Sequence, residues 1–246
     1  MAYRIVHFYP DLMSLYGSYA NVALFKRYLE ALGHEVTVDS VVLGQVADLK
    51  DADFLFMGAG TERAQKAALA DFCRFADAVK SEAEAGMTML FAGTAMELLG
   101  KTITDAGGTV YDGIGLADFV TTQGDRRLVG DVYGTTDLYP EAVVGFMNKC
   151  SRISGIETPL LTSCAMGYGN ETEGGPEGFH WKNVFASELT GPILVKNPRL
   201  LDAVASAVCG RRGEPLPEKR PVDQWAENGY AITAEQLRLR CEGRKS

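Results

Sequence analysis

The stretch from residue 91 to residue 100 (FAGTAMELLG) has the frame of a turn that presents a nucleophile at the end of a strand. An apolar strand pattern, residues 87–91, leads into small residues, and a helical pattern opens at Met96. Such a turn lifts one side chain above the sheet and directs backbone N–H groups toward a substrate. Its tip is Gly93, which has no side chain. The sequence therefore predicts the frame for nucleophilic catalysis without the nucleophile.

Few other residues could supply that chemistry. The five cysteines are scattered and form no CxxC pair, which argues for free thiols in a reducing cytoplasm and against a zinc site. Cys150 and Cys164 fall in a β-rich region, where a free cysteine is usually a small buried hydrophobe. Only three histidines exist, and we expect His180, beside Trp181, to be packed or solvated. A nucleophile relocated to another cysteine stays open as the alternative.

Composition excludes several classes of protein. The chain has 246 residues, 46% of them hydrophobic, and a net charge of −8. That charge argues against a nucleic-acid partner. The sequence contains no apolar run of the ~20 residues needed to span a membrane and no signal-peptide pattern, so we expect a cytoplasmic protein without membrane insertion. The GxGxxG and GxxxxGK[ST] motifs are absent, and we expect no cofactor and no metal.

The first half alternates strand and helix patterns. This alternation predicts an α/β, flavodoxin-like parallel core sheet flanked by helices, with ligands at the carboxyl ends of the strands. Thr61 is expected to cap a helix, with Glu62 in its first turn. The expected strands are residues 3–8, 35–38, 54–57 and 87–91, and the expected helices are residues 22–32 and 64–84.

The second half is richer in glycine and in short β patterns. We expect it to extend the sheet with antiparallel strands and long loops, and to close with a helix over residues 198–209. Residues 1–210 then form one domain, and residues 211–246 form a linker with a short helix at 234–240 and a frayed end at 242–246. The expected strands of this half are residues 117–122, 127–133, 142–146 and 183–187.

Eight segments in colinear order resemble the cobyric-acid-synthase-like group of class I glutamine amidotransferases. The likeness is greatest to the glutaminase subunit of lipid II isoglutaminyl synthase, and it covers roughly residues 1–210. The matching segments are residues 9–17 (YPDLMSLYG) with Asn21, 55–60 (LFMGAG) with Gln65, 98–100 (LLG), 113–116 (GIGL), 127–130 (RLVG), 144–148 (VGFMN), 167–170 (GYGN) with Gly178, and 189–198 (LTGPILVKNP).

The resemblance implies a cysteine that attacks the glutamine amide and a histidine that carries the proton. Gly93 stands at the cysteine position and Thr190 at the histidine position. In the same turn, Glu97 stands where the family usually has glutamine. Lys149 stands where the family has a further histidine, and we expect its side chain to face solvent. The frame is kept, and the residues that would carry the chemistry are replaced.

The resemblance also implies a ligand pocket. Arg127 stands where the family holds the glutamine α-carboxylate, for which a guanidinium fork is well suited; the alternative is a solvated charge beside Arg126. Gly58 and Gly60 stand where oxyanion-type N–H groups would lie; the alternative is simply a tight turn between strand and helix.

Three functions follow from this. The preferred one is an amidotransferase-like subunit without glutaminase activity, paired with a Mur-ligase-like synthetase in amidation of the peptidoglycan precursor lipid II. It would act as a structural or regulatory subunit, or as a glutamine-independent channel for ammonia. The others are an active glutaminase with a relocated nucleophile and a non-catalytic module that binds glutamine or another small carboxylate.

Overall fold

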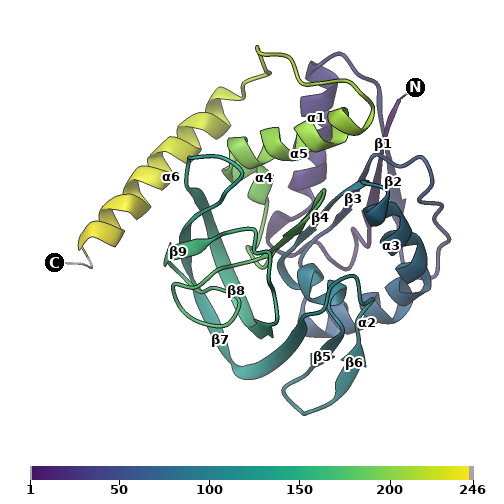
Figure 1. Cartoon of the computed structure of the whole chain (residues 1–246), viewed down its shortest axis with the longest axis vertical. Coiled ribbons are helices and arrows are strands. Elements are labelled where there is room, and N and C mark those ends of the chain that lie inside the picture. Colours follow the sequence, from purple (N-terminus) through teal and green to yellow (C-terminus); the bar gives the residue numbers. More distant parts are fainter. Residues whose placement is uncertain (1, 244–246) are drawn as a thin grey trace.

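A computed structural model describes residues 2–243 (Figure 1). Its centre is a six-stranded sheet in the order β10-β11-β4-β3-β1-β2, in which every neighbouring pair is parallel except β10 and β11. This arrangement confirms the predicted α/β fold with a parallel core. In chain order the strands are β1 (Tyr3–Phe8), β2 (Val36–Val41), β3 (Phe54–Met57), β4 (Thr88–Ala92), β10 (Phe179–Trp181) and β11 (Val184–Ser187).

Helices cover both faces of this sheet because its central strands are apolar on both sides. In β3, Leu55 and Met57 belong to one hydrophobic cluster, whereas Phe54 and Phe56 belong to the other. The first cluster includes residues of the two helices that follow β3. The second includes residues of the first helix of the chain and of the two helices that follow β11. Figure 1 shows where these helices lie around the sheet. These helices are α2 (Glu62–Phe72) and α3 (Ala76–Glu84) on the first side, and α1 (Ala20–Ala31), α4 (Ile193–Lys196) and α5 (Pro198–Arg211) on the second.

The antiparallel strands predicted for the second half occur in two places. The strand β10 pairs antiparallel with β11 and extends the core sheet at its edge. The remaining strands form a separate second sheet in the order β6-β5-β7-β8, with β9 on β7, in which every pair is antiparallel except β5 with β7. Two predicted strands merge into β7, whose register shifts between Gln123 and Leu128. The second sheet consists of β5 (Thr102–Thr104), β6 (Val110–Asp112), β7 (Val120–Thr135), β8 (Val143–Ser154) and β9 (Ser163–Met166).

Two helix predictions were wrong in their bounds. The single helix expected over residues 64–84 is interrupted by a 3₁₀ turn at Cys73–Phe75. At this break Phe72 and Phe75 both pack on Phe8, with ring centroids 5.1 and 5.0 Å from it. The packing of both rings on Phe8 therefore stabilises the interrupted helix more than the backbone hydrogen bonds of a continuous helix would.

The second correction concerns the C-terminal helix. α6 (Gln224–Gly243) has 20 residues and begins ten residues before the predicted start at 234. It is held against the second sheet, where Leu237 and Cys241 are buried and the Tyr230 hydroxyl donates to the Ala142 carbonyl at 2.8 Å. The frayed end expected over residues 242–246 starts inside this helix, and residues 244–246 lie outside the described residues.

One buried amide links the helical layer to the second sheet. Asn197, 1% exposed, accepts a hydrogen bond from the Val144 N–H and donates to the Val144 and Ile193 carbonyls, all at 2.8–2.9 Å. Three backbone groups thus depend on one side chain, which fixes where the chain after β11 meets β8.

We predict that Asn197→Ala lowers the free energy of unfolding by about 3 kcal/mol, because it leaves buried backbone groups of Val144 without partners. The measurement is urea unfolding followed by circular dichroism. The matched control is Asn228→Ala on the exposed side of α6, for which we expect a change below about 0.5 kcal/mol. Equal effects of the two substitutions would contradict this role for Asn197.

Candidate active site

The turn after β4 lies where ligands bind in parallel sheets, at the carboxyl ends of the strands. Gly93 follows Ala92, the last residue of β4, and starts the 3₁₀ segment Gly93–Leu99. Its φ is +62°, a left-handed conformation that favours glycine and that a nucleophile elbow imposes on its central residue. We call residues 92–94 the elbow. Its place at the end of the fourth parallel strand is the one that the sequence predicts.

Residues expected from four separate segments surround one small pocket at the elbow, with a volume of about 170 Å³. Gly93, Thr190, Arg127 and Gly60 all line it. Gly58 does not line it: a Cβ at this position would lie 2.5 Å from the Met13 carbonyl oxygen, so its backbone packs against the segment before α1. We call this cavity the elbow pocket.

No thiol and no imidazole of the described residues lines the elbow pocket. His7 is buried in β1, and burial lowers its pKa to about 4. His180 packs against Phe185 in β11, with ring centroids 4.8 Å apart. Among residues 2–243 no cluster of histidine, cysteine and carboxylate side chains could hold a metal ion. The pocket therefore lacks both groups that attack on an amide would require.

Thr190 does not replace the missing base. It is 4% exposed, and its hydroxyl donates to the Phe146 carbonyl at 2.9 Å while its N–H donates to the same oxygen at 2.8 Å. The side chain is thus turned back onto β8 and serves to join the end of β11 to the second sheet.

A buried ion pair forms one wall of the elbow pocket. Lys149 and Glu188 line it and contact each other, with side chains 2% and 1% exposed. The Lys149 ammonium also donates to the Gly169 carbonyl at 2.8 Å, and the Ser151 hydroxyl donates to the Glu188 carboxylate. The expectation of a solvent-facing Lys149 was wrong, because the side chain is drawn inward by this carboxylate.

Two further carboxyl groups lie buried behind that pair. Burial, with a smaller contribution from the Glu188 charge, raises the pKa of Glu97 to about 7. Burial also raises the pKa of Glu177 to about 7, against the effect of the hydrogen bonds that it accepts from the Ser187 hydroxyl and the Glu188 N–H. Glu97 accepts a hydrogen bond from Gln123 at 2.7 Å. Burial thus raises the pKa of both carboxyl groups close to neutral pH, so a share of each carries a proton there.

Arg127 is already engaged by the protein. Its guanidinium donates to the Glu62 carboxylate at 2.8 Å and to the Asn148 side-chain oxygen at 2.6 Å. Asn148 in turn donates to the Tyr16 hydroxyl at 2.8 Å, and Tyr16, at φ +59°, stands half-exposed beside the pocket. The fork expected to hold a ligand carboxylate therefore holds an internal one.

The N–H groups of the turn after β3 are also engaged. The Ala59 N–H donates to the Ser18 hydroxyl at 3.3 Å, and the Gly60 N–H donates to the Thr94 hydroxyl at 2.9 Å. An oxyanion hole needs N–H groups that are free to bind the ligand oxygen. Here they fix the turn in place instead.

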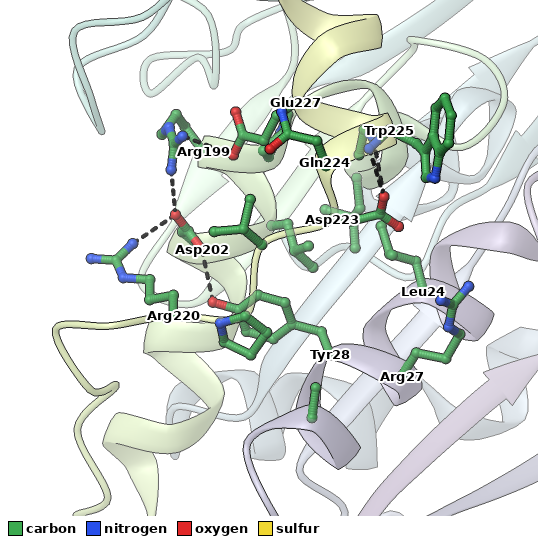
Figure 2. A pocket seen from close by; sticks show the side chains of 17 residues that line it. Leu24, Arg27, Tyr28, Arg199, Asp202, Arg220, Asp223, Gln224, Trp225 and Glu227 are labelled. Atoms are coloured by element: carbon green, nitrogen blue, oxygen red, sulfur yellow. Dashed lines mark hydrogen bonds and ion pairs between the residues drawn. The ribbon is translucent and has the colours of Figure 1, made fainter.

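A larger cavity lies elsewhere, between α1, α5 and the start of α6 (Figure 2). It measures about 410 Å³, and four of its charged side chains, those of Arg199, Asp202, Arg220 and Glu227, form ion pairs with one another. Asp202 accepts from Tyr28 at 2.8 Å and pairs with Arg199 and Arg220 at 2.9 and 2.7 Å. These contacts join the segment before α6 to α1 and α5, and we interpret this cavity as part of that joint.

Three features around the elbow pocket were missed from the sequence: the buried Glu188, the half-exposed Tyr16 and the methyl group of Ala59 beside Gly93. Glu188 carries a signal that could have been used, since one charge in the apolar stretch 184–189 indicates a buried, paired group. Tyr16 and Ala59 carry none, because a positive φ at a tyrosine and a contact between two turns become visible only in three dimensions.

Comparison with known proteins agrees with this geometry. The model of the CobB/CobQ-like glutamine amidotransferase domain matches residues 4–198. The chain is 30% identical over 233 residues to the GatD subunit of lipid II isoglutaminyl synthase (glutamine-hydrolyzing) from Staphylococcus aureus, covering 95% of this chain and 93% of the relative. It is 32% identical over 200 residues to the subunit of the same name from Streptococcus pneumoniae, covering 80% and 76%.

Solved structures share the fold at low identity. A chain of the PurLQS structure from Thermotoga maritima matches with a TM-score of 0.54 and 13% identity, covering 83% of this chain and 98% of that one. A glutamine amidotransferase from the same organism matches with a TM-score of 0.52 and 10% identity, covering 97% and 96%. No helix of residues 2–243 combines the length and apolarity that crossing a membrane requires.

From the raised pKa of Glu97 we predict how the stability of the fold depends on pH. Between about pH 4.5 and 7 the folded chain keeps this proton while the unfolded chain releases it, so the free energy of unfolding falls as pH rises through that window. Glu97→Gln carries no such proton and can still accept from Gln123. We expect its thermal midpoint, relative to the unmodified chain, to rise between about pH 5 and about pH 8.

The control for this series is Glu218→Gln, an exposed position for which the difference should not change with pH. A difference for Glu97→Gln that is the same at every pH would show that the carboxyl group is ionised in the folded chain.

Proposed function

The chain belongs to the CobB/CobQ-like glutamine amidotransferase family, and we propose that it is a subunit for amidation of lipid II that does not itself hydrolyse glutamine. The lipid II assignment rests on the two relatives, both named as GatD subunits of lipid II isoglutaminyl synthase. The loss of hydrolysis rests on the elbow pocket.

The observation that carries the proposal is that the pocket keeps its position and loses its reactive groups. Gly93 stands at the elbow and Thr190 faces the same pocket. Hydrolysis of an amide through a covalent intermediate needs a nucleophile and a base to activate it. Gly93 has only a hydrogen atom in place of a side chain, so it supplies no nucleophile. The Thr190 hydroxyl is hydrogen-bonded to a backbone carbonyl, so it supplies no base.

Two cysteines could in principle act from elsewhere, and their surroundings argue against it. Burial and the nearby Glu62 carboxylate raise the pKa of Cys150 to about 12, and burial raises the pKa of Cys164 to about 12. The thiolate is the reactive form, so both remain thiols at neutral pH. Cys150 also lines a separate, acidic cavity on the other side of the Arg127–Glu62 pair.

The partner in this proposal is a Mur-ligase-like synthetase that carries out the amidation. Our chain would stabilise that synthetase, regulate it, or provide a path for free ammonia. Both relatives are named as a subunit, which supports the proposal that this chain works together with a second chain. A module that binds a small carboxylate is the second candidate, favoured by Arg127 in the elbow pocket. Such a ligand would have to displace Glu62 from the guanidinium.

We predict that the purified chain, alone or with its synthetase, releases no ammonia from glutamine above background. Without a nucleophile, only the catalysis due to binding and polarisation remains, orders of magnitude below an intact site. The measurement is an enzyme-coupled assay of glutamate and ammonia. Turnover that disappears in Cys150→Ala or Cys164→Ala, and persists in the matched Cys73→Ala, would establish a relocated nucleophile instead.

A further inference from the structure

The turn after β3 and the elbow after β4 approach each other closely. A Cβ added at Gly93 would lie 2.6 Å from the Ala59 Cβ and 3.3 Å from the Ala59 Cα. Carbon atoms that are not bonded prefer separations of about 3.5–4.0 Å. The side chain of Ala59 therefore occupies the space in which a side chain at position 93 would begin.

We propose that Ala59 excludes any nucleophile from the elbow, so that the chain holds a side chain at position 59 or at position 93 but not at both. This inference rests on the proposed function and deepens it: two positions, Gly93 and Ala59, keep a nucleophile out of the elbow. It assigns to Ala59 a role in positioning and not in chemistry. The role would hold for cysteine, serine or alanine at position 93 alike, because all three begin with the same carbon atom.

The two turns cannot move apart easily. The Thr94 hydroxyl accepts from the Gly60 N–H at 2.9 Å and donates to the Gly60 carbonyl at 3.0 Å, and the Gln65 side chain donates to the Thr94 carbonyl at 2.7 Å. Each of these bonds joins the residue after Gly93 to the segment after Ala59. All of these groups are buried, so separating the turns would leave polar atoms without partners.

Ala59 is also held from its other side. It is 1% exposed, its N–H donates to the Ser18 hydroxyl at 3.3 Å, and its carbonyl accepts from the Leu15 N–H at 2.9 Å. Backbone bonds on both sides leave no direction in which the methyl group could withdraw. Only removal of the methyl group would open the space.

A double-mutant cycle on thermal unfolding tests this inference. We expect Gly93→Ala to lower the midpoint by about 10 °C, because it adds steric overlap to an unfavourable positive φ. Ala59→Gly alone should lower it by about 3 °C. The double variant should nevertheless melt higher than Gly93→Ala alone, because it removes the overlapping methyl group.

Gly115→Ala is the matched control. Gly115 also has φ +62°, but its added Cβ would meet only the flexible Lys80 ammonium at 3.7 Å. It therefore reports the cost of the positive φ, about 4 °C, without the overlap. Ala59→Gly should not rescue this variant.

The inference is overturned if Ala59→Gly lowers the midpoint equally in the Gly93→Ala and Gly115→Ala backgrounds. It is overturned too if Gly93→Ala and the double variant both fail to fold, because the overlap would then not be the cause. If Gly93→Ala fails to fold and the addition of Ala59→Gly restores folding, the inference is supported. The cycle uses no glutamine, so its result is independent of whether the unmodified chain hydrolyses glutamine.

Discussion

The contact between two loops, one after β3 and one after β4, constrains the rest of the site. Both loops follow neighbouring parallel strands, so their backbones leave the sheet side by side. The Thr94 hydroxyl joins them through both polar groups of Gly60. In an enzyme such closeness serves catalysis, since one loop presents the nucleophile and the other its N–H groups. Here the same closeness leaves room for a single side chain.

The charged side chains that line the elbow pocket pair with one another, so the pocket carries little net charge. Lys149 and Glu188 neutralise each other, and Arg127 is paired with Glu62. Breaking a buried pair by removing one partner leaves an uncompensated charge, which costs several kcal/mol. Removing either partner of the buried Lys149–Glu188 pair would therefore destabilise the pocket, whereas the Arg127–Glu62 pair, with side chains 43% and 33% exposed, contributes little to stability and mainly occupies the guanidinium. A ligand that reaches the pocket must compete with groups of the protein itself.

Much of the framework could be predicted because it depends on local patterns. The strands β1 and β3 have the predicted bounds, since short apolar runs ended by polar or small residues determine them. Thr61 caps α2 as expected, with its hydroxyl accepting from the Ala64 N–H at 3.1 Å. Gly93 could be placed at the elbow because the strand, the turn and the segment after it adjoin in the chain.

The remainder depends on contacts between segments that are distant in the chain. Lys149 and Glu188 are 39 residues apart, and Ala59 and Gly93 meet only because β3 and β4 pair. The length of α6 follows from its packing on β8 and β9, which its own sequence does not reveal. Glycine at an elbow is visible in the sequence, whereas the alanine that fills the space beside it is not.

The most direct test of the account follows the nitrogen. The purified chain and the proposed Mur-ligase-like synthetase would be given lipid II with either amide-labelled ¹⁵N-glutamine or ¹⁵N-ammonium, and the product would be analysed by mass spectrometry. We predict label in the product from ammonium and none from glutamine, because no thiol and no imidazole among the residues that the structure describes lines the elbow pocket. Transfer of label from glutamine at a rate comparable to that from ammonium would contradict it.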